Sequence, residues 1–128
     1  MNERPRNLLL ADDDADLRFA LRRILERAGF VVSEAENGDQ ALQALEGATF
    51  DLLITDLIMP TREGLETIQA CRRLHPALPI VAISGGGRIK PDDYLALAKR
   101  LGAQRTLAKP FSGEELILAA QDALAEAR

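Results

Sequence analysis

Short apolar segments of strand length alternate along the chain with longer segments in which apolar residues recur at helical spacing. Five segments have the length and composition of strands: 7–11, 30–35, 51–55, 79–84 and 105–108. The first, third and fourth are almost continuously apolar, which is typical of parallel strands buried on both faces. Each is followed by a segment with helical periodicity, so the pattern predicts alternating strands and helices.

Capping residues mark the expected ends of the helices. Asp14 precedes the first helical segment as an N-cap, and Gly29 follows it as a C-cap. The third helical pattern covers residues 62–75. The other predicted helix starts are Asn37 with Gln40, Pro91, and Ser112 with Glu115.

This alternation predicts an α/β fold with a parallel sheet, right-handed crossovers and helices on both faces. No linker, low-complexity stretch or internal repeat interrupts it, and 128 residues suit a single domain. We expect residues 7–127 to form that domain after a short N-terminal extension of residues 1–6.

Composition narrows the classes of function. The net charge is −4, and the 16 basic residues are scattered among 20 acidic ones, which argues against a nucleic-acid surface. No apolar run reaches membrane-spanning length, so we expect a cytoplasmic protein with neither membrane nor direct nucleic-acid contact. Cys71 is alone and is predicted to be a small, half-buried thiol. His75, before Pro76, is expected to be exposed or stabilised by the helix dipole at a helix end, and not to carry phosphate.

Polar side chains gather where the predicted strands end. They are Asp12, Asp13 and Asp14 after the first strand, Asp56 after the third, Ser84 with Gly85, Gly86 and Gly87 after the fourth, and Lys109 with Pro110 after the fifth. Because the carboxyl ends of parallel strands meet at one edge of a sheet, we expect these groups to lie close together.

The chemistry of this set is that of phosphoryl transfer. Clustered carboxylates repel one another unless a cation lies among them, and oxygen ligands suit Mg2+. A metal ion, a lysine and a hydroxyl are the groups that stabilise the charge of a transferring phosphoryl group. Asp56 would be the nucleophile, since a carboxylate can form an acyl phosphate.

These residues and their order resemble the response-regulator receiver domain of bacterial two-component signalling, over essentially the whole chain. The matching residues are Asp12 and Asp13 in "LLLADDD", Asp56 in "DLLITDLIMP", Ser84 in "PIVAISG" and Lys109 in "LAKPF". The resemblance implies a flavodoxin-like (βα)5 fold whose sheet has the strand order 2-1-3-4-5.

The resemblance also implies roles for the matching residues. A sensor histidine kinase or a histidine phosphotransfer protein would pass a phosphoryl group to Asp56. Asp13 and Asp56 would bind Mg2+ directly, Asp12 largely through water, and the backbone carbonyl of Ile58 would complete the protein ligands. Ser84 and Lys109 would contact the phosphoryl group. Such a domain promotes only its own phosphorylation and dephosphorylation, so we do not expect an enzyme.

One position departs from the family pattern and bears on signalling. Three residues before Lys109, where the family commonly has a rotating Tyr or Phe, the chain has Thr106. The change on phosphorylation is therefore expected in the glycine-rich segment after the fourth strand and in the helix that follows it. The residues of interest for the switch are Ser84, Gly85, Gly86, Gly87 and Thr106.

The family usually presents its output on the surface of the fourth helix, fifth strand and fifth helix. Because the chain ends with the fifth helix, we expect a stand-alone regulator, monomeric or weakly dimeric, that binds a target protein, relays phosphate or drains it from a kinase.

Other functions fit the sequence less well. A calcium loop starting at Asp12 would need glycine where Leu17 stands and glutamate where Arg23 stands. A haloacid-dehalogenase-type phosphatase would need threonine where Ala15 or Asp16 stands. The remaining alternative is a receiver-like interaction module that is never phosphorylated, and the presence of all five site residues argues against it.

Overall fold

The computed structural model describes residues 4–57, 64–84 and 91–126, of which 91–95 are described by their backbone alone. Five strands and five helices alternate along this part of the chain. They are β1 (Asn7–Ala11), α1 (Ala15–Arg27), β2 (Val31–Ala35), α2 (Gly38–Gly47), β3 (Leu52–Asp56), α3 (Gly64–Leu74), β4 (Ile80–Ser84), α4 (Pro91–Arg100), β5 (Arg105–Ala108) and α5 (Gly113–Glu126).

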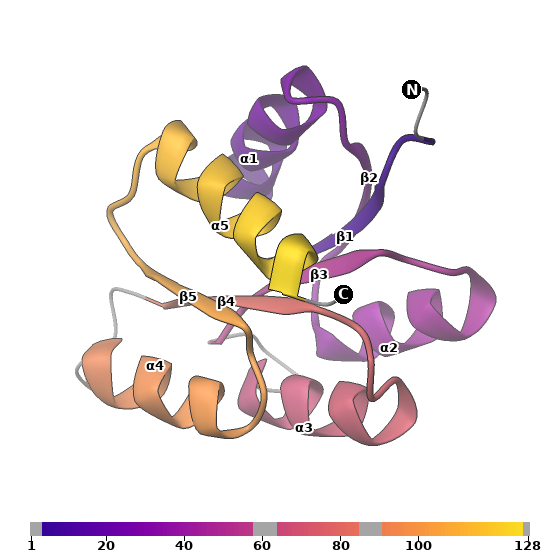
Figure 1. Ribbon diagram of the computed structural model, residues 1–128, viewed down its shortest axis with the longest axis vertical. Helices are drawn as coiled ribbons and strands as arrows, with labels where there is room; N and C mark the ends of the chain where they lie inside the picture. The colour runs from indigo at the N-terminus through magenta and orange to yellow at the C-terminus, as the bar shows by residue number, and fades with distance from the viewer. Residues whose placement is uncertain (1–3, 58–63, 85–90, 127–128) are drawn as a thin grey trace.

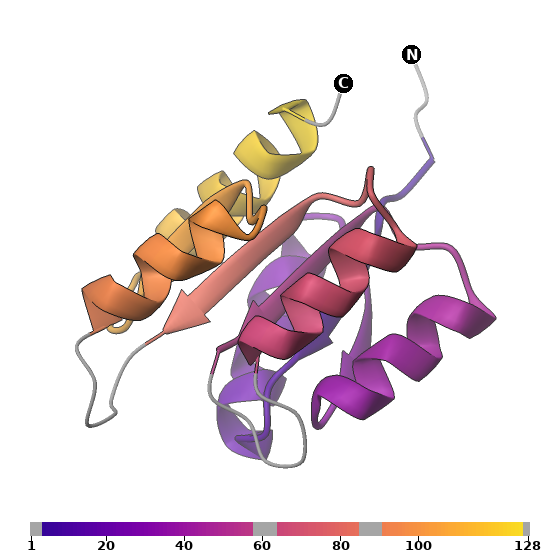
Figure 2. The ribbon, with the colours of Figure 1, turned by 90° about the horizontal axis from the view of Figure 1, so that it is seen from below.

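The strands form one parallel sheet in the order β2-β1-β3-β4-β5. Helices α1 and α5 cover one face, and α2, α3 and α4 cover the other (Figure 1). Figure 2 shows these last three helices side by side across the sheet. The predicted flavodoxin-like fold and strand order are confirmed.

Two apolar cores lie on the two faces of the sheet. Alternate residues of β1 supply them, since Leu9 packs in the core beneath α2 and α3, while Leu8 and Leu10 pack beneath α1 and α5. The same division holds on β3, where Leu53 and Ile54 belong to opposite cores. The central strands are therefore buried on both faces, as their continuous apolar sequences indicated.

The ends of the helices and strands differ slightly from the predicted ones, and the difference matters at the end of β3. Strand β3 runs one residue further than expected, so Asp56 is its last residue and not the first residue after it. Its backbone conformation is therefore set by the sheet.

The predicted caps are present. The Asp14 side chain accepts the N–H of Leu17, and Gly29, with φ of +100°, follows the end of α1. Ser112 and Glu115 form a reciprocal capping box. At α2 the Asn37 side chain accepts the N–H of Gln40, but the Gln40 side chain accepts the N–H of Glu36 and not that of Asn37.

The burial of two residues differs from the predictions. Cys71 was expected to be half-buried, but it is fully buried, because the α3 face that carries it packs in the same core as Ile68 and Leu53. Burial raises the pKa of its thiol to about 11, so the thiol stays protonated and unreactive. His75 is half-buried and not exposed, and its backbone N–H donates to the Cys71 carbonyl at 2.6 Å. Among the described helices, none has the length and apolar character needed to cross a bilayer.

Candidate functional site

The predicted site residues lie together at the carboxyl edge of the sheet. Asp12 directly follows β1, Asp56 ends β3, Ser84 ends β4 and Lys109 directly follows β5. Strand register sets their order, because Ala11 pairs with Thr55 and Ser84 pairs with Ala108. The Lys109 N–H also donates to the Ser84 carbonyl at 2.8 Å. The backbone alone therefore places these residues in one row at the edge of the sheet.

Three carboxylates form an acidic cluster in this row. Asp12, Asp13 and Asp56 each place one oxygen within 4.8 Å of the others. Asp12 and Asp56 are buried, being 1% and 5% exposed, whereas Asp13 is open to solvent. Two buried acids and one exposed acid at this separation make a site that a cation can enter from the Asp13 side.

Asp12 shows the electrostatic cost of the cluster. Burial is the main cause that raises the pKa of Asp12 to about 6, and the charges of Asp56 and Asp13 add to it. The backbone N–H of Asp14 and the Lys109 ammonium partly offset these effects. The carboxylate thus lies where an anion is disfavoured unless a cation accompanies it.

The hydrogen bonding of Asp12 shows that the cluster fits a metal ion. Its Oδ1 accepts the Asp14 N–H at 2.9 Å, while its buried Oδ2 has no hydrogen-bond partner in the described residues. A buried polar atom without a partner is costly and uncommon in a folded protein. Three carboxylates with one unsatisfied oxygen are the donor set that a hard divalent cation such as Mg2+ takes. The residues present therefore fit the expected ion.

Lys109 is paired with the expected phosphoacceptor. Its Nζ lies 3.0 Å from Oδ2 of Asp56, and its side chain is 28% exposed. Burial alone would lower the pKa of the Lys109 ammonium, but the hydrogen bond and charge of Asp56, followed by the charges of Asp12 and Asp14, raise it overall. Lys109 is therefore a permanent cation at the edge of the acidic cluster.

The remaining expected residues are placed as follows. Ser84 is buried at the end of β4, between the strand ends that carry Asp56 and Lys109. Thr106 is half-buried on β5 and pairs in register with Ala82. Ile58, Gly85, Gly86 and Gly87 lie outside the described residues.

Gly64 is one residue whose importance the sequence did not reveal. A Cβ at this position would lie 2.8 Å from the Leu57 carbonyl carbon and would collide with the Asp56 carbonyl oxygen. The Gly64 N–H donates to the Leu57 carbonyl at 3.0 Å. The first turn of α3 therefore packs directly on the strand end that carries Asp56. The only sign of this role in the sequence was a glycine at the start of a helix, at a position where no turn required glycine.

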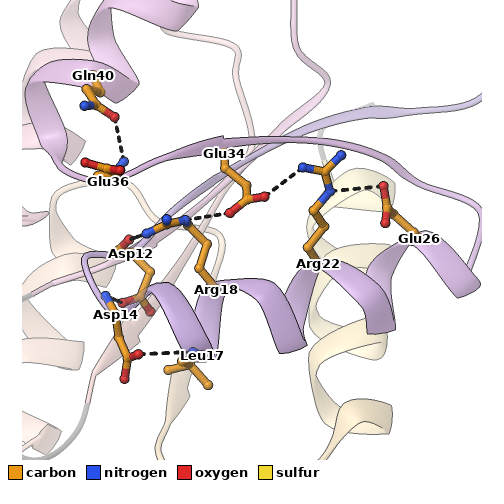
Figure 3. A network of polar contacts seen from close by, with 9 residues as sticks. All are labelled: Asp12, Asp14, Leu17, Arg18, Arg22, Glu26, Glu34, Glu36 and Gln40. Atoms are coloured by element: carbon orange, nitrogen blue, oxygen red, sulfur yellow. Dashed lines mark hydrogen bonds and ion pairs between the residues drawn. The ribbon is translucent and has the colours of Figure 1, made fainter.

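Arg18 is the second such residue. It is buried on α1, its Nη1 donates to the Asp12 carbonyl at 2.6 Å, and its Nε donates to Glu34 at 2.6 Å (Figure 3). A signal was present, because Arg18 lies three and seven residues before Leu21 and Leu25, on the buried stripe of the helix. A cation on that stripe must find acceptors, and these acceptors were not evident from the sequence.

Comparisons with known proteins identify the family of this chain. The response regulator receiver domain model matches residues 8–121. The transcriptional regulatory protein CpxR of Escherichia coli (strain K12) is 39% identical over 110 residues, which are 86% of this chain and 45% of CpxR. The transport regulator DctD of Rhizobium meliloti (strain 1021) is 35% identical over 117 residues, which are 91% of this chain and 25% of DctD. The chain thus spans less than half the length of these relatives.

A solved structure gives the same result. The receiver domain of NtrX from Brucella abortus has a TM-score of 0.86 at 32% identity, covering 92% of this chain and 98% of that one. A family model that spans most of the chain, the shared fold and the acidic row at the strand ends lead to one conclusion. The chain belongs to the response regulator receiver domain family of two-component systems.

Proposed function

We propose that this chain accepts a phosphoryl group on Asp56 in a Mg2+-dependent reaction and signals the change to other proteins. The donor would be the phosphohistidine of a sensor kinase or of a histidine phosphotransfer protein. The observation that carries the proposal is the position of Asp56, a buried carboxylate between the acids of β1 and the ammonium of Lys109. The unpartnered Oδ2 of Asp12 adds to it, since an interaction module without a metal ion gains nothing from that atom.

In this proposal the three acids hold the metal ion. Asp13 and Asp56 would bind it directly, and Asp12 would bind it largely through water; one oxygen of each lies within 4.8 Å of the others. When bound, Mg2+ would neutralise part of the charge on the clustered carboxylates and on the phosphoryl oxygens. The Ile58 carbonyl, outside the described residues, is proposed as a further ligand.

The protein side chains would then carry out an in-line displacement. A carboxylate oxygen of Asp56 forms a bond to phosphorus while the bond between phosphorus and the donor imidazole breaks, and the imidazole nitrogen keeps the electron pair. Lys109, which pairs with Asp56 in the unphosphorylated state, would move its contact to a phosphoryl oxygen. The Ser84 hydroxyl would donate to another. The acyl phosphate is later hydrolysed at the same site, and no separate substrate is turned over.

The output is proposed to appear on the face formed by α4, β5 and α5. The two helices of this face each carry an exposed leucine, Leu97 on α4 and Leu118 on α5, at 41% and 57% exposure. We propose three uses for the phosphorylated state: it binds a target protein, it passes its phosphoryl group on, or it drains phosphoryl groups from a kinase. Experiment can distinguish them.

The test is phosphorylation by a small phosphodonor, such as acetyl phosphate, with and without Mg2+. We expect the wild-type protein to gain a phosphoryl label that is stable in acid and labile in alkali. The label should require Mg2+ and should be absent from Asp56→Asn. Label that persists in Asp56→Asn would remove Asp56 from its proposed role. Incubation with a panel of phosphorylated kinases and phosphotransfer proteins would then show which donor loses label to this chain and which protein regains it.

A further inference from the structure

The backbone of Asp12 is held on both sides. Its N–H donates to the Ala35 carbonyl at 3.1 Å, and its own carbonyl accepts from Nη1 of Arg18 at 2.6 Å. The first contact ties the residue to β2, and the second ties it to α1. Asp12 therefore cannot rotate about its backbone without breaking one of these contacts.

The turn that follows is held by local bonds. Oδ1 of Asp12 accepts the Asp14 N–H at 2.9 Å, Oδ1 of Asp14 accepts the Leu17 N–H at 3.1 Å, and the Arg18 N–H donates to the Asp14 carbonyl at 2.8 Å. These bonds occupy one oxygen of Asp12 and leave its buried Oδ2 without a hydrogen-bond partner in the described residues. The acidic turn is thus set before any cation arrives.

The position of the Arg18 guanidinium is unusual for a cation beside three acids. Arginine normally pairs with a carboxylate through two parallel hydrogen bonds. Here Nη1 instead contacts the backbone carbonyl of Asp12, and Nε contacts Glu34 (Figure 3). The guanidinium therefore steadies the turn without occupying an oxygen that a metal ion needs.

Glu34 is itself held in place. Its Oε1 accepts from Arg18 at 2.6 Å, and its Oε2 accepts from Nη1 of Arg22 at 2.7 Å. Arg22 also donates to Glu26 at 3.1 Å, which fixes its own side chain along α1 (Figure 3). The hydrogen bond from Arg22 and, after it, that from Arg18 lower the pKa of Glu34, which therefore remains an anion. A charged, doubly held Glu34 keeps the Arg18 guanidinium in its place.

We infer that Arg18 and Glu34 act together as positioning residues for divalent-cation binding: Arg18 fixes the Asp12 carbonyl, and Glu34 keeps the guanidinium from pairing with the site carboxylates. This inference rests on the proposed function, since it concerns the same metal site. Without Glu34 the guanidinium would lose its carboxylate partner, and the carboxylate of Asp12, whose carbonyl it already contacts, would become an alternative partner. The pair would thus prevent the protein from blocking its own metal site.

The test is a double-mutant cycle read by direct binding of Mn2+, measured from the loss of the free-ion signal in electron paramagnetic resonance. We expect Glu34→Gln to raise the Kd for Mn2+ about tenfold, because a neutral amide holds the guanidinium more weakly than the carboxylate does. Arg18→Gln should raise the Kd less. The turn at Asp12 loosens in this variant, but no guanidinium remains to compete with the metal ion for the site carboxylates. The double variant should bind like Arg18→Gln and therefore better than Glu34→Gln.

A matched control tests whether the loss of a cation from α1 by itself changes the affinity, as in Arg18→Gln. Arg23→Gln removes a cation from the same helix, but Arg23 is exposed and its guanidinium lies over the Phe19 ring, 5.7 Å from the centroid. We expect its Kd for Mn2+ to stay within about twofold of wild type, since exposed charges are screened. Thermal unfolding of each metal-free variant checks that the fold is intact.

The possible results distinguish failure of this inference from failure of the proposed function. Wild-type affinity in Glu34→Gln, or a double variant that binds no better than Glu34→Gln, would overturn the inference while leaving the metal site in place. Failure of the wild type to bind Mn2+, or unchanged binding in Asp13→Asn, would overturn the proposed function and this inference with it. Recovery of affinity on adding Arg18→Gln to Glu34→Gln is the result that supports it.

Discussion

Asp12 makes the stability of the metal-free protein depend on pH. Its folded pKa of about 6 lies above the value of about 3.9 expected in the unfolded chain, so the folded state binds the proton more tightly. The contribution of Asp12 to stability is therefore favourable below about pH 4 and is lost as the pH rises through 6.

Asp12→Asn should remove this dependence. In the presence of a chelator we expect the variant to be more stable than wild type at pH 7 by about 2–3 kcal/mol, with little difference at pH 4. Urea unfolding of both proteins at the two pH values measures the effect. A wild type that is more stable than Asp12→Asn at pH 7 without metal would contradict the electrostatic account of the cluster.

Asp13 and Asp14 should behave differently although they are adjacent. Asp13→Ala removes a proposed ligand and should greatly weaken Mg2+ binding, while relief of repulsion leaves the metal-free protein at least as stable. Asp14→Ala removes the cap of α1 and should cost about 0.5–2 kcal/mol of stability with a smaller effect on Mg2+ affinity. Calorimetric titration measures the Mg2+ affinity of each variant, and urea unfolding measures its stability. The reverse order of Mg2+ affinities would contradict the assignment of Asp13.

At the scale of elements, the contact of α3 with the end of β3 is expected to control the site. Gly64→Ala would push a methyl group into the backbone of Asp56 and Leu57, so we expect lower stability and slower labelling of Asp56. Gly47→Ala is the control, because a Cβ at Gly47, the last residue of α2, meets nothing within 4 Å. Labelling in Gly64→Ala at the wild-type rate would show that the strand end does not depend on this contact.

Arg72 joins three elements through backbone carbonyls. Its guanidinium donates to the carbonyls of Pro76 and Leu78, after α3, and to that of Gly102, after α4, each at 2.8 Å. Gln104 adds a link, since its side chain accepts the N–H of Ile80 at 2.7 Å. These contacts anchor the carboxyl end of α4 at the start of β4.

Loss of this anchor should be costly. We expect Arg72→Ala to destabilise the protein by about 2–4 kcal/mol, because several carbonyls lose a charged donor together. Arg72→Lys should recover only part of it, since a single ammonium cannot reach all the acceptors. Urea unfolding tests this against Arg73→Ala, an exposed neighbour. Equal stability of the two alanine variants would mean that the contacts of Arg72 contribute nothing.

The elements were more predictable from sequence than the contacts between them. The apolar runs of β1, β3 and β4 and the caps at Asp14 and Ser112 are local signals, and each acts within a few residues. The gathering of Asp12, Asp56 and Lys109 followed from the topology of parallel sheets. The carbonyl partner of Arg18 and the approach of Gly64 to β3 depend on tertiary packing, which no periodicity encodes. The full burial of Cys71 likewise depends on how α3 is rotated on the sheet.

At the scale of the whole molecule, a signal must pass from the strand ends to the α4–β5–α5 face. Thr106 is too short to act as the rotating ring that the family commonly uses on this strand, and it is half-buried on β5. The sequence instead places three glycines between Ser84 and α4, and this segment lies outside the described residues. We therefore expect the change to enter α4 at its amino end, since its carboxyl end is anchored by Arg72.

Amide hydrogen exchange with and without beryllofluoride and Mg2+ tests this route. A ligand shifts a conformational equilibrium only by its differential affinity, and new contacts of Ser84 and Lys109 with the mimic would supply about 1–3 kcal/mol. We expect changes in protection from residue 85 into the first turns of α4 that fade toward Gly102. Thr106→Ala should leave the pattern nearly unchanged, whereas Ser84→Ala should reduce it. Unchanged protection throughout residues 85–101, or a change confined to β5 that Thr106→Ala abolishes, would show that the signal takes another path.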